Sequence, residues 1–305
     1  MKAIIKLSSM GDIIHSLVVL PKLKERVSFF VDSSFKEIVN HNPYIKQIID
    51  IPLRKAKKDK SLFFKAYKSL KHYKFDETYD LQGLLKSAIV GKIVSKRLIG
   101  YSNPREKIAS FFYDEKITSR SEVAIKRYME LFKLEDDEYL VNHPKLLFYK
   151  DREFDFLSKN RKNVVFIIGA SWECKKTPLK VWIELGKYLK SENIIIPVSN
   201  DMEEKEAEKI ALTVSNVKIV KLNLNDLKAL ITKSDLLIGN DTGPSFIAWA
   251  NNVNNIILYG CTYNNKILEN GFSKSVEIQK GRIDRKLDVM DKIDVKQIIG
   301  KIDEF

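Results

Sequence analysis

The sequence predicts an α/β fold made of two doubly wound, Rossmann-like domains. Apolar runs of strand length alternate with longer segments of helical period, and this alternation occurs twice along the chain. A length of 305 residues suits two domains of about 100–200 residues each. A charged segment lies between the two alternations, so we expect domains at 1–150 and 151–305.

The expected strands are runs rich in Ile, Val, Leu and Phe, and the expected helices begin near Asp, Ser, Thr or Pro. In the first half, strands are expected at 2–7, 28–32, 47–51, 76–80 and 97–100, and helices at 13–26, 61–73, 83–94 and 122–134. In the second half, strands are expected at 163–168, 193–198, 217–221, 235–239 and 255–259, and helices at 179–190, 202–214, 225–232 and 244–250. A C-terminal helix at 295–302 is a candidate for packing back on the N-terminal domain.

The composition is that of a soluble globular protein, with 44% hydrophobic and 30% charged residues. No apolar run reaches the roughly 20 residues of a membrane-spanning helix, and no signal-peptide pattern precedes the first strand, so we expect a cytosolic protein. Cys174 and Cys261 are far apart in sequence, and we expect two unpaired thiols rather than a disulfide or a zinc site.

A formal net charge of +13 indicates an anionic partner, although a general Lys bias contributes to it. The basic residues cluster in Arg54-Lys55-Ala56-Lys57-Lys58-Asp59-Lys60 and continue as Lys65, Lys68, Lys71 and Lys74. For the later lysines, at three-residue spacing, we favour a solvated helix face. For 54–60, an anion-binding loop and a solvated loop both remain open.

Ligands of doubly wound sheets bind beyond the carboxyl ends of the strands, and with two domains the default site is the cleft between them. The first such turn is Ser8-Ser9-Met10-Gly11-Asp12. Its structural alternative is a helix start with Asp12 as the N-cap. Capping does not account for two serines and a glycine, which let a ligand approach the backbone, so we favour a functional carboxylate at Asp12.

Two further turns carry polar groups that suit a phosphate. Gly239-Asn240-Asp241-Thr242-Gly243-Pro244 joins an apolar strand to a helix whose N–H groups and dipole favour an anion. Gly169-Ala170-Ser171-Trp172-Glu173-Cys174-Lys175 offers a hydroxyl and an ammonium for a diphosphate. Helix capping and an incidental surface loop are the respective alternatives.

Several sharper motifs are absent from the sequence. Gly83-Leu84-Leu85-Lys86-Ser87 lacks the full P-loop pattern, and no G-x-G-x-x-G follows a strand. No D-x-D occurs, so a metal held by closely spaced carboxylates on a nucleotide diphosphate is not indicated.

Taken together, these motifs resemble the lipopolysaccharide heptosyltransferase family, closest to heptosyltransferase I. The matching pieces are KLSSMGDIIH at 6–15, DLQGLLKS at 80–87, DTGP at 241–244 and LYG at 258–260. The resemblance implies a GT-B fold, two Rossmann-like domains facing across a cleft, with the acceptor mainly on the N-terminal domain and the nucleotide sugar mainly on the C-terminal one. It implies inverting, metal-independent transfer of L-glycero-D-manno-heptose from ADP-heptose to Kdo (3-deoxy-D-manno-octulosonic acid) of Kdo-lipid A, without a cofactor.

The same resemblance assigns roles to individual residues. Asp12 is then the general base for the acceptor hydroxyl, and Lys175 neutralises charge on the departing ADP. The implied donor-binding residues are Ser171, Lys175, Glu203, Asp241, Thr242 and Gly243, and the implied acceptor-binding residues are Ser9, Gly11, Arg54, Lys57, Lys58 and Gln82.

The resemblance also suggests where the protein acts and where it departs from its family. The basic stretch implies a peripheral position on the anionic cytoplasmic face of the inner membrane, with no nucleic-acid partner. The family pattern D-[ST]-G-x-x-H has Phe246 at its last position here, which leaves the donor sugar open. The alternatives are a related GT-B glycosyltransferase with another donor or acceptor, and a non-catalytic basic protein that binds anions or nucleic acid.

Overall fold

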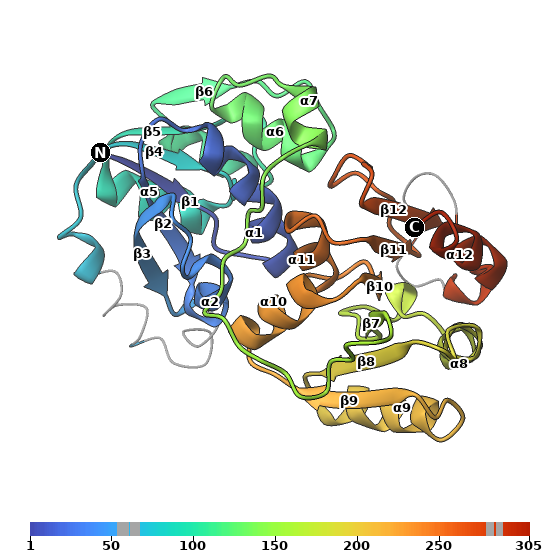
Figure 1. Cartoon of the computed structure of the whole chain (residues 1–305). Helices are drawn as coiled ribbons and strands as arrows, with labels where there is room; N and C mark the ends of the chain where they lie inside the picture. The colour runs from blue at the N-terminus through green and yellow to red at the C-terminus, as the bar shows by residue number, and fades with distance from the viewer. Residues whose placement is uncertain (54–60, 62–67, 279–283, 285–288) are drawn as a thin grey trace. The chain divides into compact units, whose positions relative to one another are not determined.

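The computed structural model describes residues 1–53, 61, 68–278, 284 and 289–305 (Figure 1). The chain divides into two compact units, Met1–Phe148 and Tyr149–Phe305. Each unit contains a six-stranded sheet, and every recorded strand pairing is parallel. The prediction of two doubly wound, Rossmann-like units is confirmed.

The N-terminal sheet has the strand order β3-β2-β1-β4-β5-β6. Its strands are β1 (Lys2–Ile5), β2 (Val27–Asp32), β3 (Ile45–Ile51), β4 (Phe75–Asp80), β5 (Ser95–Tyr101) and β6 (Glu115–Ile117). The helices of this unit are α1 (Met10–Ser16), α2 (Lys36–Val39), α5 (Leu85–Val94), α6 (Ala124–Leu131) and α7 (Asp137–Val141), with 3₁₀ turns at Leu17–Lys22, Ser33–Phe35 and Lys107–Phe112.

The C-terminal sheet repeats this topology in the order β12-β11-β10-β7-β8-β9. Its strands are β7 (Asn163–Ile167), β8 (Asn193–Val198), β9 (Val217–Lys221), β10 (Leu236–Asn240), β11 (Asn255–Tyr259) and β12 (Ser273–Glu277). The helices are α8 (Leu179–Tyr188), α9 (Asp201–Ala211), α10 (Leu224–Lys233), α11 (Ser245–Ala250) and α12 (Val295–Ile302), with 3₁₀ turns at Glu173–Lys175 and Met290–Lys292.

The largest differences from the expected elements have local causes. The first helix begins at Met10 rather than at residue 13, because Ser9 is its N-cap. It gives way after Ser16 to a 3₁₀ turn that contains Pro21, which has no N–H for a helical hydrogen bond. The expected helix 61–73 overlaps residues outside the described part of the chain. The edge strands β6 and β12 were missed because both are short and partly polar.

The core of the C-terminal unit includes its last helix. The partly buried residues Val295, Ile299 and Ile302 of α12 pack against the cluster formed by Val276, Ile298 and their apolar neighbours. Contacts of α12 are recorded with α8, β11 and β12 of the same unit (Figure 1). In the described part of the chain, no helix is both long and apolar enough to cross a bilayer.

A buried carboxylate organises the turn that follows β4. Asp80 is fully buried and accepts hydrogen bonds from the backbone N–H groups of Gln82 (2.9 Å) and Gly83 (3.1 Å). It also accepts from the hydroxyls of Ser87 (2.9 Å) and Tyr113 (2.8 Å). Burial raises the pKa of Asp80, and these hydrogen bonds oppose the rise. Gly83 has a φ of +64°, a conformation that other residues rarely adopt, so the turn requires glycine at this position.

We expect Gly100→Ala to lower the free energy of unfolding by about 1–3 kcal/mol, because it overpacks the contact with Tyr113. A Cβ at Gly100 would lie 2.4 Å from the Tyr113 ring, whose hydroxyl must stay in place for Asp80. Urea unfolding followed by circular dichroism measures the effect.

The control is Gly300→Ala in α12, where a Cβ meets nothing within 4 Å. This control should gain about 0.5–1 kcal/mol from helix propensity. An equal change in the free energy of unfolding for Gly100→Ala and Gly300→Ala would contradict the prediction.

Candidate active site

Most of the predicted site residues follow the central strands of each sheet, while Glu203 follows β8. In both units the strand order reverses between two adjacent parallel strands, β1 and β4 in one and β7 and β10 in the other. Ligands of doubly wound folds bind at such reversals, beyond the carboxyl ends of the strands. The turn Ser8–Asp12 follows β1, and the turn that begins at Asp241 follows β10.

The carboxylate of Asp12 is held by the residue that begins its helix. Asp12 is the third residue of α1, and its Oδ2 accepts hydrogen bonds from Ser9 N (3.3 Å) and Ser9 Oγ (3.1 Å). The N-cap is therefore Ser9 rather than Asp12. Asp12 still serves the helix start, because it is the third-residue partner of a capping box and accepts from the Ser9 backbone N–H. Asp12 is partly exposed, Ser9 is exposed and Gly11 is buried. The site thus presents an oriented, solvent-accessible carboxylate.

Gln82 joins the two turns of the N-terminal unit. Its Oε1 accepts hydrogen bonds from the backbone N–H groups of Leu7 and Ser8, both at 3.1 Å. The side chain is 6% exposed, and its oxygen already accepts two bonds, so a ligand contact would have to come from the Nε2 group. Gln82 therefore fixes the position of the Ser8–Asp12 turn relative to the turn after β4.

Two residues to which the sequence assigned no role, Lys6 and Tyr128, lie close enough to Asp12 for its charge to affect their pKa values. The Lys6 ammonium is buried, donates to the carbonyl of Leu81 (3.1 Å) and lies 5.2 Å from the centre of the Tyr128 ring. Burial lowers the pKa of Lys6, while the charges of Asp12 and Asp80 act to raise it. Burial raises the pKa of Tyr128, and the Asp12 charge raises it further.

The basic loop predicted to bind the acceptor, with Arg54, Lys57 and Lys58, lies outside the described residues. Of the lysines that continue it, Lys68, Lys71 and Lys74 are described, and all three are exposed.

In the C-terminal unit, a charged cluster forms around Asp241. Its carboxylate forms an ion pair with Lys175, whose ammonium also donates to the Asp241 carbonyl (3.3 Å). Thr262 donates its hydroxyl to the same carboxylate at 2.7 Å. The Lys175 and Asp241 side chains are 13% and 5% exposed, and the ammonium lies 4.7 Å from the centre of the Trp172 ring. Both recorded hydrogen bonds of the Lys175 ammonium, which has three N–H donors, therefore go to Asp241.

Asn240, at the end of β10 and next to Asp241, forms hydrogen bonds with three other segments of the chain. Its Oδ1 accepts from Thr177 N (3.2 Å) and Thr177 Oγ1 (2.6 Å), and its Nδ2 donates to the carbonyl of Ile168 (2.7 Å). Ser245 at the start of α11 donates to its carbonyl (2.6 Å). Because Asn240 is fully buried, these bonds set the relative positions of the turns after β7 and β10.

Glu203 lies close to the turn after β7. Its Oε2 accepts from the backbone N–H (2.7 Å) and the hydroxyl (2.8 Å) of Ser199. A Cβ at Gly169 would lie 2.3 Å from Glu203 Oε1, so only glycine fits there without displacing the carboxylate. Ser171, two residues further on, is exposed. The structure therefore places Glu203 and the beginning of the Gly169–Lys175 segment side by side.

The turn before α11 contains the other predicted donor-binding residues. Thr242 and Gly243 precede the helix and are partly exposed, whereas Phe246 is 3% exposed. The Thr242 hydroxyl is buried and has no hydrogen-bond partner among the described residues. Such a group has a donor to offer to a ligand oxygen.

The prediction of two free thiols is wrong. Cys174 and Cys261 form a disulfide, with a Cα–Cα distance of 5.5 Å across 87 residues of sequence. Sequence spacing carries no information about this proximity, because it arises when the turn after β7 and the turn after β11 meet in the folded unit. The described residues contain no group of three or more His, Cys, Asp or Glu that could hold a metal ion.

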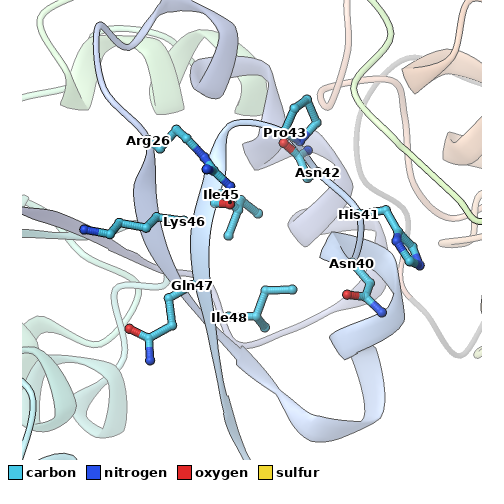
Figure 2. A pocket seen from close by; sticks show the side chains of 9 residues that line it. All are labelled: Arg26, Asn40, His41, Asn42, Pro43, Ile45, Lys46, Gln47 and Ile48. Carbon is cyan, nitrogen blue, oxygen red and sulfur yellow. Dashed lines mark hydrogen bonds between the residues drawn. The ribbon is translucent and has the colours of Figure 1, made fainter.

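A shallow pocket of about 360 Å³ lies elsewhere in the N-terminal unit, between the end of α2 and β3 (Figure 2). It is lined by Arg26, Asn40, His41, Asn42, Pro43, Ile45, Lys46, Gln47 and Ile48. None of the predicted site residues is among them, and the turns after β1 and β4 do not contribute to it.

Comparison with known proteins identifies the family to which this arrangement belongs. The profile of glycosyltransferase family 9 (heptosyltransferase) matches residues 63–288, and the chain belongs to this family. The lipopolysaccharide heptosyltransferase 1 of Campylobacter coli is 31% identical over 290 residues, which covers 85% of this chain and 84% of that protein.

Solved structures of relatives have the same fold. The E. coli heptosyltransferase WaaC with ADP aligns with a TM-score of 0.82 at 20% identity, over 100% of this chain and 99% of that one. The same enzyme with ADP-2-deoxy-2-fluoro heptose aligns with a TM-score of 0.78 at 21% identity, over 99% and 100%. The GT-B assignment and the resemblance to heptosyltransferase I are thereby confirmed.

Three polar residues of the site were given no individual role from the sequence. Lys6 is part of the KLSSMGD motif, but its burial was not foreseen. Thr262 follows the LYG motif and Asn240 precedes DTGP, so the motifs pointed to their neighbourhoods without identifying them. Their side chains form hydrogen bonds to residues distant in sequence, such as that between Thr262 and Asp241, 21 positions apart.

We expect Asn240→Ala to lower the free energy of unfolding by about 2–4 kcal/mol, because it leaves the buried Thr177 groups and the Ile168 carbonyl unpaired. Asn160→Ala, at an exposed position, is the matched control and should stay within about 0.5 kcal/mol of the parent. Urea unfolding of both variants provides the measurement. A loss for Asn240→Ala no larger than that of the control would show that the amide does not hold these segments.

Proposed function

We propose that the chain transfers L-glycero-D-manno-heptose from ADP-heptose to a Kdo residue of Kdo-lipid A, with inversion at the anomeric carbon and Asp12 as general base. Family membership supports heptose transfer in lipopolysaccharide synthesis. The observation that carries the finer proposal is the Asp12 carboxylate, held by Ser9 in the motif turn after β1.

The proposed reaction is a single in-line displacement. The Asp12 carboxylate removes the proton from the acceptor hydroxyl, whose oxygen attacks the anomeric carbon of the donor. The bond from that carbon to the diphosphate breaks at the same time, and ADP leaves from the opposite face. The two hydrogen bonds from Ser9 keep the carboxylate in one orientation, which favours proton transfer because the base needs no reorientation.

We assign the donor to the C-terminal unit and the acceptor to the N-terminal unit. Lys175 supplies positive charge for the departing diphosphate, and Thr242 offers a buried hydroxyl that has no partner among the described residues. Glu203 is assigned to the ribose, while Ser171, Asp241 and Gly243 complete the donor side. On the acceptor side we assign Ser9, Gly11 and Gln82, of which Ser9 contacts the base directly.

Support for ADP-heptose as the donor comes from the solved relative described with an ADP-heptose analogue. Phe246 is buried, so it contributes shape rather than polar contact where the family pattern has a histidine. The proposal includes no metal ion and no cofactor. It places the enzyme at the anionic cytoplasmic surface of the inner membrane, where Arg54, Lys57 and Lys58 bind the acceptor head group.

We expect Asp12→Asn to reduce heptose transfer by about 10²–10⁴-fold, because an amide cannot accept the proton. Its affinity for ADP should change by less than about twofold, because the base contributes to the transition state rather than to donor binding. The measurements are ADP release from ADP-heptose with and without Kdo-lipid A, and ADP binding by calorimetry.

The control for this experiment is Asp294→Asn, which replaces an aspartate that caps α12 by accepting from Lys296 N at 2.9 Å. This variant should retain full transfer. Loss of both transfer and ADP binding in Asp12→Asn would identify Asp12 as a structural residue. Acceptor-dependent release from a different nucleotide sugar, with none from ADP-heptose, would contradict the proposed donor.

A second prediction concerns the acceptor. The triple variant Arg54→Ala, Lys57→Ala, Lys58→Ala should raise the KM for Kdo-lipid A by about ten- to hundredfold at low salt, because each cation contributes about 1 kcal/mol near an anionic surface. The KM for ADP-heptose should not change. The control removes the same number of charges at Lys68, Lys71 and Lys74, which are exposed. Equal effects of the two triple variants would mean that only total charge matters.

A further inference from the structure

The Cys174–Cys261 disulfide joins the residues that immediately precede Lys175 and Thr262 of the charged cluster in the C-terminal unit. Cys174 belongs to the 3₁₀ turn Glu173–Lys175, and Cys261 follows β11 at Gly260. The two residues are 1% and 2% exposed, and they form a small apolar cluster with Val289. The crosslink therefore connects two segments that reach the site from different strands.

Each cysteine immediately precedes a residue that holds Asp241. Lys175 follows Cys174 and forms the ion pair with the Asp241 carboxylate. Thr262 follows Cys261 and donates its hydroxyl to the same carboxylate at 2.7 Å. The disulfide thus fixes the spacing between the two side chains that share this acceptor.

Besides the disulfide, one recorded backbone hydrogen bond joins the two segments, from Cys261 N to the carbonyl of Cys174 at 3.1 Å. The contact is close, since a Cβ at Gly260 would lie 2.1 Å from that carbonyl oxygen. Breaking the covalent link would leave this bond, the apolar contacts and the shared Asp241 carboxylate to hold them. Because the Asp241 side chain is 5% exposed, loss of either partner would leave a buried carboxylate with fewer hydrogen bonds.

We propose that Cys174 and Cys261 form a thiol–disulfide modification site that positions the donor site, and that the disulfide form binds ADP more tightly than the dithiol form. This inference rests on the proposed function, because it takes the cluster around Asp241 to be the donor-binding site. Both cysteines act through Lys175 and Thr262, so they are positioning residues rather than catalytic ones.

The chemistry is reversible exchange with a dithiol or with a low-molecular-weight disulfide. In reduction, a thiolate of the dithiol attacks one sulfur, and its second thiolate then releases the mixed disulfide. The reductant loses two electrons and two protons and becomes a disulfide, while Cys174 and Cys261 each gain a thiol hydrogen. Both sulfurs are buried, so exchange requires local opening of the segment around them.

The test measures ADP binding by calorimetry for the oxidised and the reduced protein. Oxidised glutathione prepares one state and dithiothreitol the other, and a thiol titration in denaturant verifies zero or two thiols per chain, since the sequence has two cysteines. We expect the Kd for ADP to rise by about fivefold or more on reduction, a typical size for coupling between two sites, and to return on re-oxidation. Circular dichroism must show both states folded at the assay temperature.

The matched control is the double variant Cys174→Ala, Cys261→Ala, which contains no thiol. Its Kd should equal that of the reduced protein and should not respond to dithiothreitol. Equal Kd values for the two verified states would overturn the inference and leave the proposed function standing, as would a failure of oxidised glutathione to form the disulfide. Absence of ADP binding in both states would instead contradict the proposed function together with this inference.

Discussion

The reversal of strand order in each sheet is the constraint on which the functional site depends. Because β1 pairs in parallel with β4, and β7 with β10, the carboxyl ends of each pair of adjacent strands lie at the same end of the sheet. The chain leaves the two strands toward opposite sides, so their turns diverge and leave room for a ligand. This backbone geometry places the Asp12 turn in one unit and the Asp241 turn in the other.

In both units a buried amide side chain stabilises this reversal. Gln82, after β4, accepts from the backbone just beyond β1, and Asn240, at the end of β10, donates to the backbone just beyond β7. An amide can accept and donate without carrying charge, so it satisfies buried backbone groups at little desolvation cost. The repeated arrangement gives each site turn a fixed position before any ligand binds.

Charge has different functions inside and outside the sites. Surface pairs such as Lys96 with Asp76 are solvent-exposed and contribute little to stability. The Lys175–Asp241 pair is nearly buried and shares Thr262, so removal of either charge would leave the other poorly compensated. The Lys6 ammonium is likewise buried, near the carboxylates of Asp12 and Asp80. Buried charge thus occurs beside the residues assigned to acceptor and donor, and also elsewhere, at Asp32, Asp226 and Lys228.

The sequence by itself determined the alternation of strands and helices, the two-unit organisation and the motif turns, because apolar period and turn residues are local properties of the chain. It did not reveal β6 and β12, because both strands are short and partly polar. They are recognised as strands by their pairing with β5 and β11. Only the tertiary structure joined Cys174 to Cys261 and Thr262 to Asp241. Such contacts depend on where distant turns meet, and that is fixed by the packing of the whole sheet.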